Sequence, residues 1–369
     1  MKNLNFFSLV LVLTAMTSVT CFSQRRDLLT ITDLTGTRPV KDKLDWADRR
    51  AQVLQGMQEA MGPLPAWSDL PAFDTKTVDT LVEELYTRYT IHFTVAKDEV
   101  VPAYLYIPSA VKKHEKRPAM LALHGTGDLG KQLVDGKSIL ANRALARELA
   151  QRGYVVIAPD YPSMGELKDY DFANDRYQSA TMKAIFNHMR CVDLLQSLPN
   201  VDPARIGVIG HSLGGHNAMF VGAFDTRLKV VVSSCGWTLL DYYNIGEEGS
   251  KRYGGRLGPW AQDRYMPLLR DRFNLDGDKI PFDFDEVIAA IAPRAFFSNS
   301  PVNDSNFDVK GVEKGIASAG KVYRLLKAEK NLQVHYPAAG HDFPTEVRLK
   351  AYRFIDNALR HKPNEQPLE

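Results

Sequence analysis

The chain has 369 residues and a mass of 41.4 kDa, with 44% hydrophobic, 10% aromatic and 24% charged residues. This composition is ordinary for a folded globular protein and excludes a collagen, a coiled coil, a disordered protein and a multi-span membrane protein. The formal net charge is only +2, so we expect no nucleic-acid partner. The length allows two domains or one large α/β domain.

The N-terminus has the pattern of an export signal. Lys2 precedes an apolar run from Phe6 to Met16, and small residues follow the run. The run is shorter than the roughly 20 residues that a membrane span needs. We therefore expect a signal peptide over residues 1–23, a periplasmic or extracellular protein, and no membrane association after cleavage. A lipoprotein beginning at Cys21 is the alternative, although Ser18 to Thr20 match that signal poorly.

Cleavage would leave two cysteines, Cys191 and Cys235, each within an apolar run. We expect buried free thiols there, and a disulfide stays open as an alternative because the protein is expected to be exported.

Residues 24–84 are predicted to form a helical lead-in, because apolar residues recur at helical spacing from Trp46 to Met61. Apolar and polar residues then alternate over Tyr89 to Val95 and again from Ala103 to Ile107, which predicts two antiparallel strands.

From residue 117 onward, short continuous apolar runs alternate with helical stretches, which is typical of a parallel sheet covered by helices on both faces. We expect about eight strands, mostly parallel, within residues 85–369. The predicted strands of this part are Ala119 to Leu123, Tyr154 to Ala158, Ile206 to Ile209, Val230 to Ser233, Ala295 to Phe297, and Leu332 to Tyr336; the helices are Ser138 to Gln151, Met182 to Leu198, and Pro344 to about Arg360.

One connection, residues 236–290, is long, aromatic and rich in glycine, and we interpret it as a cap insertion. Trp237 and Trp260 are its candidate substrate-binding residues, with packing inside the cap as the alternative. Lys251, Arg252 and Arg256 are further candidates that could meet an acidic group of a substrate, or they could form a solvated turn.

The strongest motif is Gly210-His211-Ser212-Leu213-Gly214, which follows a predicted strand and opens a predicted helix. Gly-x-Ser-x-Gly in this context is a nucleophile elbow, in which the serine occupies a strained turn and its hydroxyl stands clear of the backbone. A serine hydroxyl needs a base at neutral pH. His341 follows the last strand in a loop of small residues, where its ring can reach the carboxyl edge of the sheet.

A carboxylate should orient the imidazole of His341. The loop after the strand Ala295 to Phe297 offers Asp304 and Asp308; we favour Asp304, because Asp308 is placed to cap a helix starting near Val309. The backbone N–H groups of Leu213 and Thr126 are the candidate oxyanion donors. We expect no cofactor and no metal, because no group of histidines and carboxylates has metal-ligand spacing and this chemistry needs none.

The order His124-Gly125, Ser212, Asp304, His341 resembles the α/β-hydrolase superfamily over residues of about 85–360. Within it, Ala158-Pro159-Asp160-Tyr161-Pro162 and Gly340-His341-Asp342-Phe343-Pro344 are similar to secreted bacterial dienelactone-hydrolase-like and acetyl-xylan-esterase-like enzymes. Dienelactone hydrolases have a cysteine where this chain has Ser212, which favours ordinary ester hydrolysis.

The resemblance thus implies a serine esterase acting on a small-molecule or polysaccharide ester, of the acetyl type. The alternatives are a serine peptidase of the prolyl-oligopeptidase type and a catalytically inactive binding protein with the same fold. The acyl group, the alcohol and the oligomeric state do not follow from the sequence.

Overall fold

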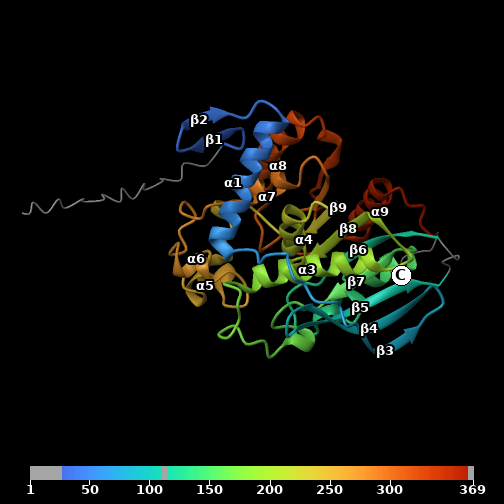
Figure 1. Ribbon diagram of the computed structural model, residues 1–369. Helices are drawn as coiled ribbons and strands as arrows, with labels where there is room; N and C mark the ends of the chain where they lie inside the picture. Colours follow the sequence, from blue (N-terminus) through green and yellow to red (C-terminus); the bar gives the residue numbers. More distant parts are fainter. Residues whose placement is uncertain (1–26, 110–114, 365–369) are drawn as a thin grey trace, which may run out of the picture.

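The computed structural model describes residues 27–109 and 115–364, and a nine-stranded sheet forms its centre (Figure 1). The strand order is β11-β10-β9-β8-β6-β7-β5-β4-β3. Strands β6 to β11 pair in parallel, whereas β3, β4 and β5 are antiparallel to their neighbours. The bounds of the strands are β3 Lys76–Val82, β4 Tyr86–Ala96, β5 Glu99–Pro108, β6 Arg117–Leu123, β7 Val155–Pro159, β8 Val201–His211, β9 Leu228–Ser234, β10 Ala295–Asn299 and β11 Leu332–His335.

This architecture confirms the predicted α/β-hydrolase fold class and corrects the strand count from about eight to nine. The additional strand, β3, lies in the segment that the sequence analysis assigned to the helical lead-in. All its side chains are exposed, so burial imposes no strong apolar pattern on it. The predicted antiparallel pair is confirmed, with Phe93 opposite Val101 in the β4–β5 ladder.

Helices cover both faces of the sheet. On one face α2 and α9 contribute to one apolar cluster, and on the other α3 and α4 contribute to a second, larger cluster that extends outward through α1, α7 and α8. Buried strands with continuous apolar sequences require this double cover. The helices are α1 Lys43–Met61, α2 Leu145–Gln151, α3 Ala180–Ser197, α4 Leu213–Phe224, α5 Gly246–Arg252, α6 Leu268–Asp271, α7 Phe284–Ile291, α8 Val309–Leu325 and α9 Thr345–Leu359.

Helix α2 begins later than the sequence predicted. The expected start was Ser138, but residues before Leu145 form bends, and Asn142 has a φ of 63°. A positive φ is incompatible with a right-handed helix, so the regular hydrogen bonding can start only after this residue.

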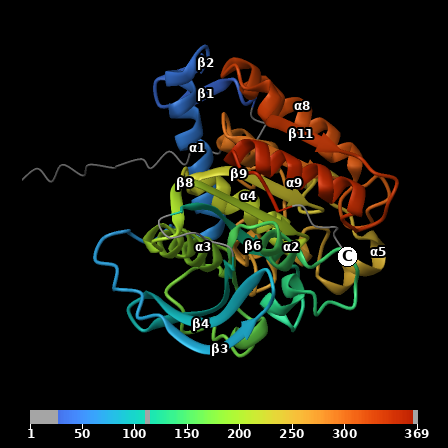
Figure 2. The same ribbon diagram turned by 90° about the vertical axis from the view of Figure 1, so that its right-hand side faces the viewer.

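The first residues that the structure describes form a ribbon and a helix that lie beside α7 and α8. A two-stranded ribbon, β1 (Thr30–Asp33) and β2 (Gly36–Pro39), leads into α1, and both views show them beside α8 (Figures 1 and 2). The side chain of Arg49 in α1 forms a buried ion pair with Glu286 in α7. The predicted helix in this segment is confirmed, whereas the ribbon was not expected.

The segment predicted as a cap, residues 236–290, divides into two parts. The first part consists of short helices, including α5 and α6, and lies over the edge of the sheet. By contrast, α7 is amphipathic, starts with a capping box at Asp283 and Glu286, and packs into the core. The cap therefore ends before α7.

Among residues 27–109 and 115–364, no helix combines the length and the apolar character that crossing a bilayer requires. The predicted signal peptide, residues 1–23, and Cys21 lie outside the described residues.

Loss of Arg49 should destabilise the protein strongly, because it would leave the Glu286 carboxylate buried without its partner. We expect Arg49→Met to lower the free energy of unfolding by about 3–5 kcal/mol, measured by urea denaturation. The double variant Arg49→Met/Glu286→Leu should recover most of this loss. Arg38→Met, which breaks surface pairs with Asp45 and Asp48, is the control and should leave the free energy of unfolding nearly unchanged. Equal losses in the two single variants would contradict this account.

Candidate active site

Ser212 occupies a strained turn between β8 and α4. Its φ of 57° and ψ of −122° lie outside the regions that side chains ordinarily adopt. Glycines on both sides allow this geometry. A Cβ atom at Gly210 would overlap the carbonyl group of Gly214, and a Cβ atom at Gly214 would overlap the carbonyl oxygen of Leu123 in β6. The close passage of three backbone segments thus explains the glycine pattern of the motif.

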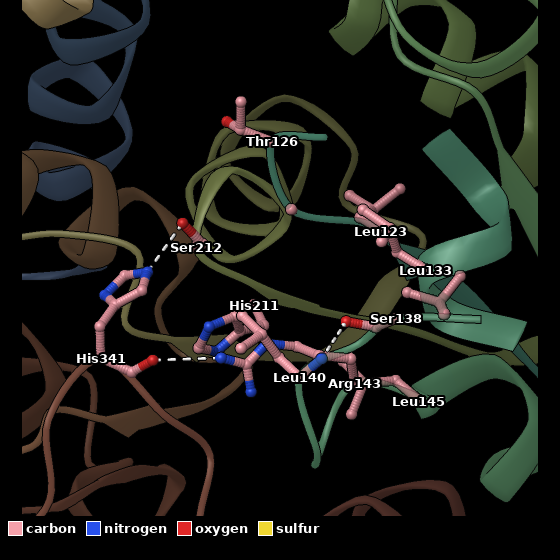
Figure 3. Close-up of a pocket in the computed structure, with 12 residues that line it drawn as sticks. Leu123, Thr126, Leu133, Ser138, Leu140, Arg143, Leu145, His211, Ser212 and His341 are labelled. Atoms are coloured by element: carbon pink, nitrogen blue, oxygen red, sulfur yellow. Dashed lines mark hydrogen bonds between the residues drawn. The ribbon is translucent and has the colours of Figure 1, made fainter. Parts of the chain in front are cut away.

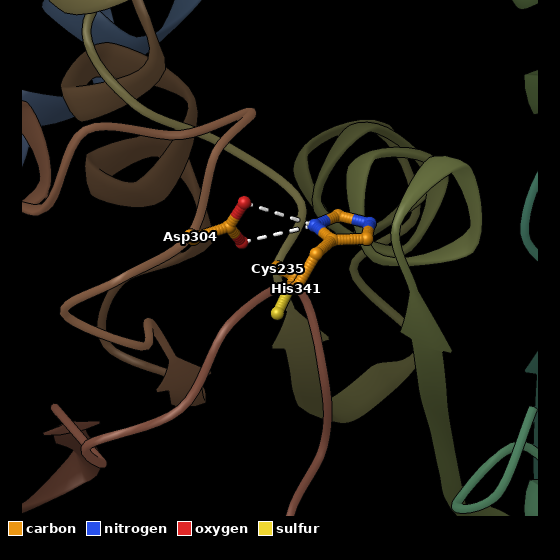
Figure 4. Close-up of side chains that lie close together, drawn as sticks. All are labelled: Cys235, Asp304 and His341. Atoms are coloured by element: carbon orange, nitrogen blue, oxygen red, sulfur yellow. Dashed lines mark hydrogen bonds and ion pairs between the residues drawn. The ribbon is translucent and has the colours of Figure 1, made fainter.

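The structure brings Ser212, His341 and Asp304 into one hydrogen-bonded chain. The Nε2 atom of His341 lies 2.9 Å from the Oγ atom of Ser212 (Figure 3). Its Nδ1 atom lies 3.0 Å from each carboxylate oxygen of Asp304 (Figure 4). These are the contacts that a nucleophile, a general base and an orienting carboxylate would make.

The loop after β10 fixes the carboxylate of Asp304. This side chain accepts hydrogen bonds from the backbone N–H groups of Asn306, at 2.8 Å, and Phe307, at 3.3 Å. Asp308 instead caps α8, accepting a hydrogen bond of 2.8 Å from the N–H group of Lys310. Asp304 thus contacts His341, whereas Asp308 contacts the first turn of α8.

A network that the sequence did not reveal holds the loop of His341. Arg143 forms an ion pair of 2.7 Å with Asp342 and donates a hydrogen bond of 3.1 Å to the carbonyl oxygen of His341 (Figure 3). The side-chain amide of Asn299 donates to the carbonyl oxygen of Asp342 at 2.9 Å. No motif marks Arg143 or Asn299, because each acts through a loop distant in sequence.

Cys235 lies directly beneath the His341–Asp304 pair (Figure 4). Its Sγ atom lies within 4.8 Å of ligand-type atoms of both residues, the only such group of three potential metal-ligating side chains among the described residues. Burial raises the pKa of the Cys235 thiol well above its usual range, so the thiol stays protonated, and the Nδ1 atom of His341 already faces Asp304. These donors fit a hydrogen-bonded triad better than a metal site. Cys191 and Cys235 are both buried and free.

The two candidate oxyanion donors line a cavity together with Ser212. Leu213 is the first residue of α4, so its N–H group precedes the hydrogen bonds within the helix. Gly125, which precedes Thr126, approaches Ser212 so closely that an added Cβ atom would lie 3.6 Å from the Cβ atom of Ser212. The hydroxyl group of Thr126 hydrogen bonds with that of Tyr265 in the cap, at 2.9 Å.

Ser212 stands between two cavities. The smaller, of about 150 Å³, also contains His341, and its walls are mostly apolar. The larger, of about 330 Å³, lies under the cap and contains the oxyanion candidates but not His341. Its remaining lining is largely aromatic, with one guanidinium group: Tyr243, Ile245, Tyr253, Pro259, Trp260, Gln262, Arg264, Tyr265, Asn306 and Phe307.

The two candidate tryptophans have different environments. Trp260 lines the larger cavity, and its role as a substrate-binding residue stays a prediction. Trp237 is 1% exposed, its indole N–H donates to the hydroxyl group of Ser298 at 3.0 Å, and its ring packs against Gly315. This corrects the expectation for Trp237, which lies in the core and cannot touch a substrate. The aromatic content of the segment did not distinguish a wall of the cleft from the core behind it.

The basic residues of the cap also differ from expectation. Arg256 donates hydrogen bonds to the backbone carbonyl groups of Leu240 and Tyr243 and so stabilises the cap itself. Neither Lys251 nor Arg252 lines the larger cavity. The guanidinium group there belongs to Arg264, which stacks on Tyr265.

Comparisons with known proteins support this architecture. The Abhydrolase family matches residues 27–235, and the family described as glucuronyl esterase of fungi matches residues 160–327. The first match spans more than half of the chain. The chain belongs to the Abhydrolase family.

Individual relatives include hydrolases and carbohydrate esterases. YtaP of Bacillus subtilis, a hydrolase by name, is 28% identical over 324 residues, which cover 85% of this chain and 99% of YtaP. Carbohydrate esterase MZ0003, from an unknown prokaryotic organism, is 28% identical over 208 residues, 52% of this chain and 46% of that protein. A glucuronoyl esterase from Solibacter usitatus shares the fold, with a TM-score of 0.67, 20% identity, and coverage of 90% of this chain and 97% of that one.

These findings confirm the predicted resemblance to α/β-hydrolase esterases and the expected enzyme class, a serine carboxylic ester hydrolase. They also support the coarser functional statement that the protein is a carbohydrate esterase.

His216 should make the protein sensitive to acid. Its ring stacks on Trp260 at 4.2 Å, and burial lowers its pKa from 6.5 to about 3. Between these two pH values, the unfolded chain binds a proton at His216 that the folded protein does not bind, so stability falls as the pH falls. The slope contributed by this residue reaches about 1.4 kcal/mol per pH unit. We expect His216→Phe to flatten the fall in unfolding free energy between pH 6.5 and pH 4. An unchanged slope in His216→Phe would contradict the assignment.

Proposed function

We propose that the protein is an exported serine esterase that cleaves carbohydrate esters through an acyl-enzyme. Ser212 is the nucleophile, His341 the general base and acid, and Asp304 the orienting carboxylate. The observation that carries the proposal is the continuous chain of contacts from the strained Ser212 through His341 to Asp304, at 2.9 and 3.0 Å. The export part of the proposal is based on the sequence pattern over residues 1–23, which predicts a signal peptide.

The reaction would proceed in two halves. The hydroxyl oxygen of Ser212 attacks the ester carbonyl carbon while the Nε2 atom of His341 takes the proton. The N–H groups of Leu213 and Thr126 donate to the developing oxyanion. His341 then returns the proton to the leaving alcohol. A water molecule, activated by His341, attacks the acyl-enzyme and releases the acid and free Ser212.

The positions of the cavities suggest which half of the ester binds where. His341 must reach the oxygen of the leaving alcohol, and of the two cavities beside Ser212 it lines the smaller and not the larger. The alcohol therefore occupies this smaller, apolar cavity, beside which the side chains of Ile139 and Leu140 are exposed. The acyl half occupies the larger cavity under the cap, where aromatic rings and Arg264 offer the stacking and hydrogen bonds that a sugar ring needs.

A sugar on the acyl side means a uronic-acid ester, in which the sugar carboxyl group forms the ester bond. The glucuronyl esterase family match and the glucuronoyl esterase with the same fold support this choice. The acetyl-type ester is the second candidate, because the cavity under the cap, of about 330 Å³, also has room for an acetyl group as the acyl half.

Asp304 and Asp308 provide a matched test of the triad. Asp304→Asn should lower kcat by several orders of magnitude, because an amide favours the wrong tautomer of His341. Asp308→Asn should leave kcat near the wild-type value and change the stability little, because asparagine caps a helix N-terminus about as well as aspartate. Steady-state kinetics and thermal unfolding of both variants measure the two effects. The reverse ranking of the kcat values would move the orienting role to Asp308.

Substrate selection is tested at the larger cavity. Tyr253→Ala should lower kcat/KM for benzyl glucuronate by roughly tenfold, about 1.4 kcal/mol, and leave 4-nitrophenyl acetate hydrolysis nearly unchanged. Tyr242→Ala is the control, because Tyr242 belongs to the same insertion but contacts α8 rather than the cavity. A wild-type preference for acetylated xylan over benzyl glucuronate would favour the acetyl-type candidate instead.

A further inference from the structure

Arg264 contributes the only charged side chain among the described residues that line the larger cavity at Ser212. The other lining side chains are aromatic, aliphatic or neutral polar groups, and none is a carboxylate. Amide and hydroxyl groups alone are sufficient to bind the hydroxyl groups of a neutral sugar. A lone positive charge in a cleft next to the nucleophile therefore bears on the charge of the acyl group that the cleft accepts.

The guanidinium group of Arg264 has no acidic partner in the part of the chain that the structure describes. Its Nε atom donates to the side-chain oxygen of Gln262 at 3.1 Å, which is a neutral acceptor and compensates no charge. The carboxylate next to it in sequence, that of Asp263, is paired with Arg270. The two terminal nitrogens of Arg264 are therefore left to water or to a ligand.

Other arginines of the same insertion have structural partners. Arg256 donates to the backbone carbonyl groups of Leu240 and Tyr243, and Arg270 pairs with two carboxylates, those of Asp263 and Asp271. The terminal nitrogens of Arg264 make neither kind of contact within residues 27–109 and 115–364. The stability of the cap thus explains the positions of Arg256 and Arg270, but it does not explain why a cation faces the cleft.

Packing holds Arg264 in a fixed position relative to the oxyanion candidates. Its guanidinium group lies 5.2 Å from the ring centre of Tyr265, and its backbone carbonyl group accepts a hydrogen bond of 2.9 Å from the hydroxyl group of Tyr161. Tyr265 in turn hydrogen bonds with Thr126 at 2.9 Å. A charged group that is already held in place loses little conformational freedom when it binds a ligand.

We propose that Arg264 binds a free carboxylate on the acyl half of the substrate, so that the preferred substrate is the ester of an acid with a second, unesterified carboxyl group. The inference rests on the proposed function, which places the acyl half in this cavity. A planar guanidinium group matches a carboxylate with two parallel hydrogen bonds, and the surrounding aromatic rings lower the local dielectric constant and strengthen the pair.

This site narrows the class of carbohydrate ester. In a uronic-acid ester the carboxyl group of the reacting sugar forms the ester bond and carries no charge. The free carboxylate then belongs to a neighbouring uronate, which makes the substrate a partly esterified acidic polysaccharide.

Matched synthetic esters isolate the contribution of the charge. 4-Nitrophenyl hydrogen adipate and hydrogen suberate are compared with 4-nitrophenyl hexanoate and octanoate, which have the same chain lengths and a methyl group in place of the carboxylate. We expect Arg264→Gln to lower kcat/KM for at least one dicarboxylate ester by about tenfold, mainly through KM, and to leave the monoacid esters within about twofold. Arg264→Lys keeps the charge and should recover part of the loss.

Arg252→Gln is the matched control. Arg252 belongs to the same insertion, is exposed and does not line the cavity, so this variant should behave like the wild type on all four esters. Salt gives a readout that needs no variant, which keeps the test decisive if Arg264→Gln folds poorly. Raising the NaCl concentration from about 0.05 M to about 0.5 M should lower kcat/KM for the dicarboxylate esters several-fold more than for the monoacid esters.

Equal effects of Arg264→Gln and of salt on the charged and neutral esters would overturn the proposal. A loss confined to benzyl glucuronate, a neutral substrate, would show that Arg264 binds sugar hydroxyl groups and would also overturn it. A wild-type protein that hydrolyses no ester would refute the proposed function. Isothermal titration with monomethyl adipate would then still decide on the carboxylate site, because its binding should be lost in Arg264→Gln and kept in Arg252→Gln.

Discussion

The structure depends on one constraint, the strained turn at Ser212. Close contacts with neighbouring backbone segments hold this serine at a φ of 57°. The N–H group of Ser212 donates to the carbonyl oxygen of Ser234 in β9 at 2.8 Å, while Gly214 touches the end of β6. The parallel pairing of β8 with both strands therefore fixes the hydroxyl group where α4 begins, beside the N-terminal end of a helix.

The same parallel arrangement assembles the other two members of the triad. Strands β10 and β11 end at the edge of the sheet where β8 ends, so the loops carrying Asp304 and His341 converge on Ser212 from one side. Each loop is then fixed by polar contacts as well as by apolar packing, since Phe307 and Phe343 belong to the core clusters. Asp304 accepts backbone N–H groups of its own loop, and Arg143 and Asn299 hold the backbone of the His341 loop. In the proposed mechanism, these contacts would hold His341 in position to take the proton of Ser212.

The parts of this architecture that the sequence predicts are those with a strong local signal. Buried strands such as β7 consist of apolar residues only, and the elbow glycines are required by close backbone contacts, so both are visible in the sequence. Strand β3 was missed because an exposed edge strand carries no apolar pattern. Trp237 was misplaced because aromatic character alone does not say whether a ring faces a cleft or the core. Arg143 and Asn299 act across distances in sequence that no local pattern encodes, and only the assembled structure relates them to the loop of His341.

The central claim is that Ser212 forms a covalent acyl-enzyme, and trapping that bond tests it most directly. A fluorophosphonate probe reacts with an activated serine and leaves a stable adduct that intact-protein mass spectrometry detects. The account predicts one adduct per chain, located by peptide mapping on Ser212, and none in Ser212→Ala. An adduct on another residue, or an unmodified wild-type protein that still hydrolyses esters, would contradict it.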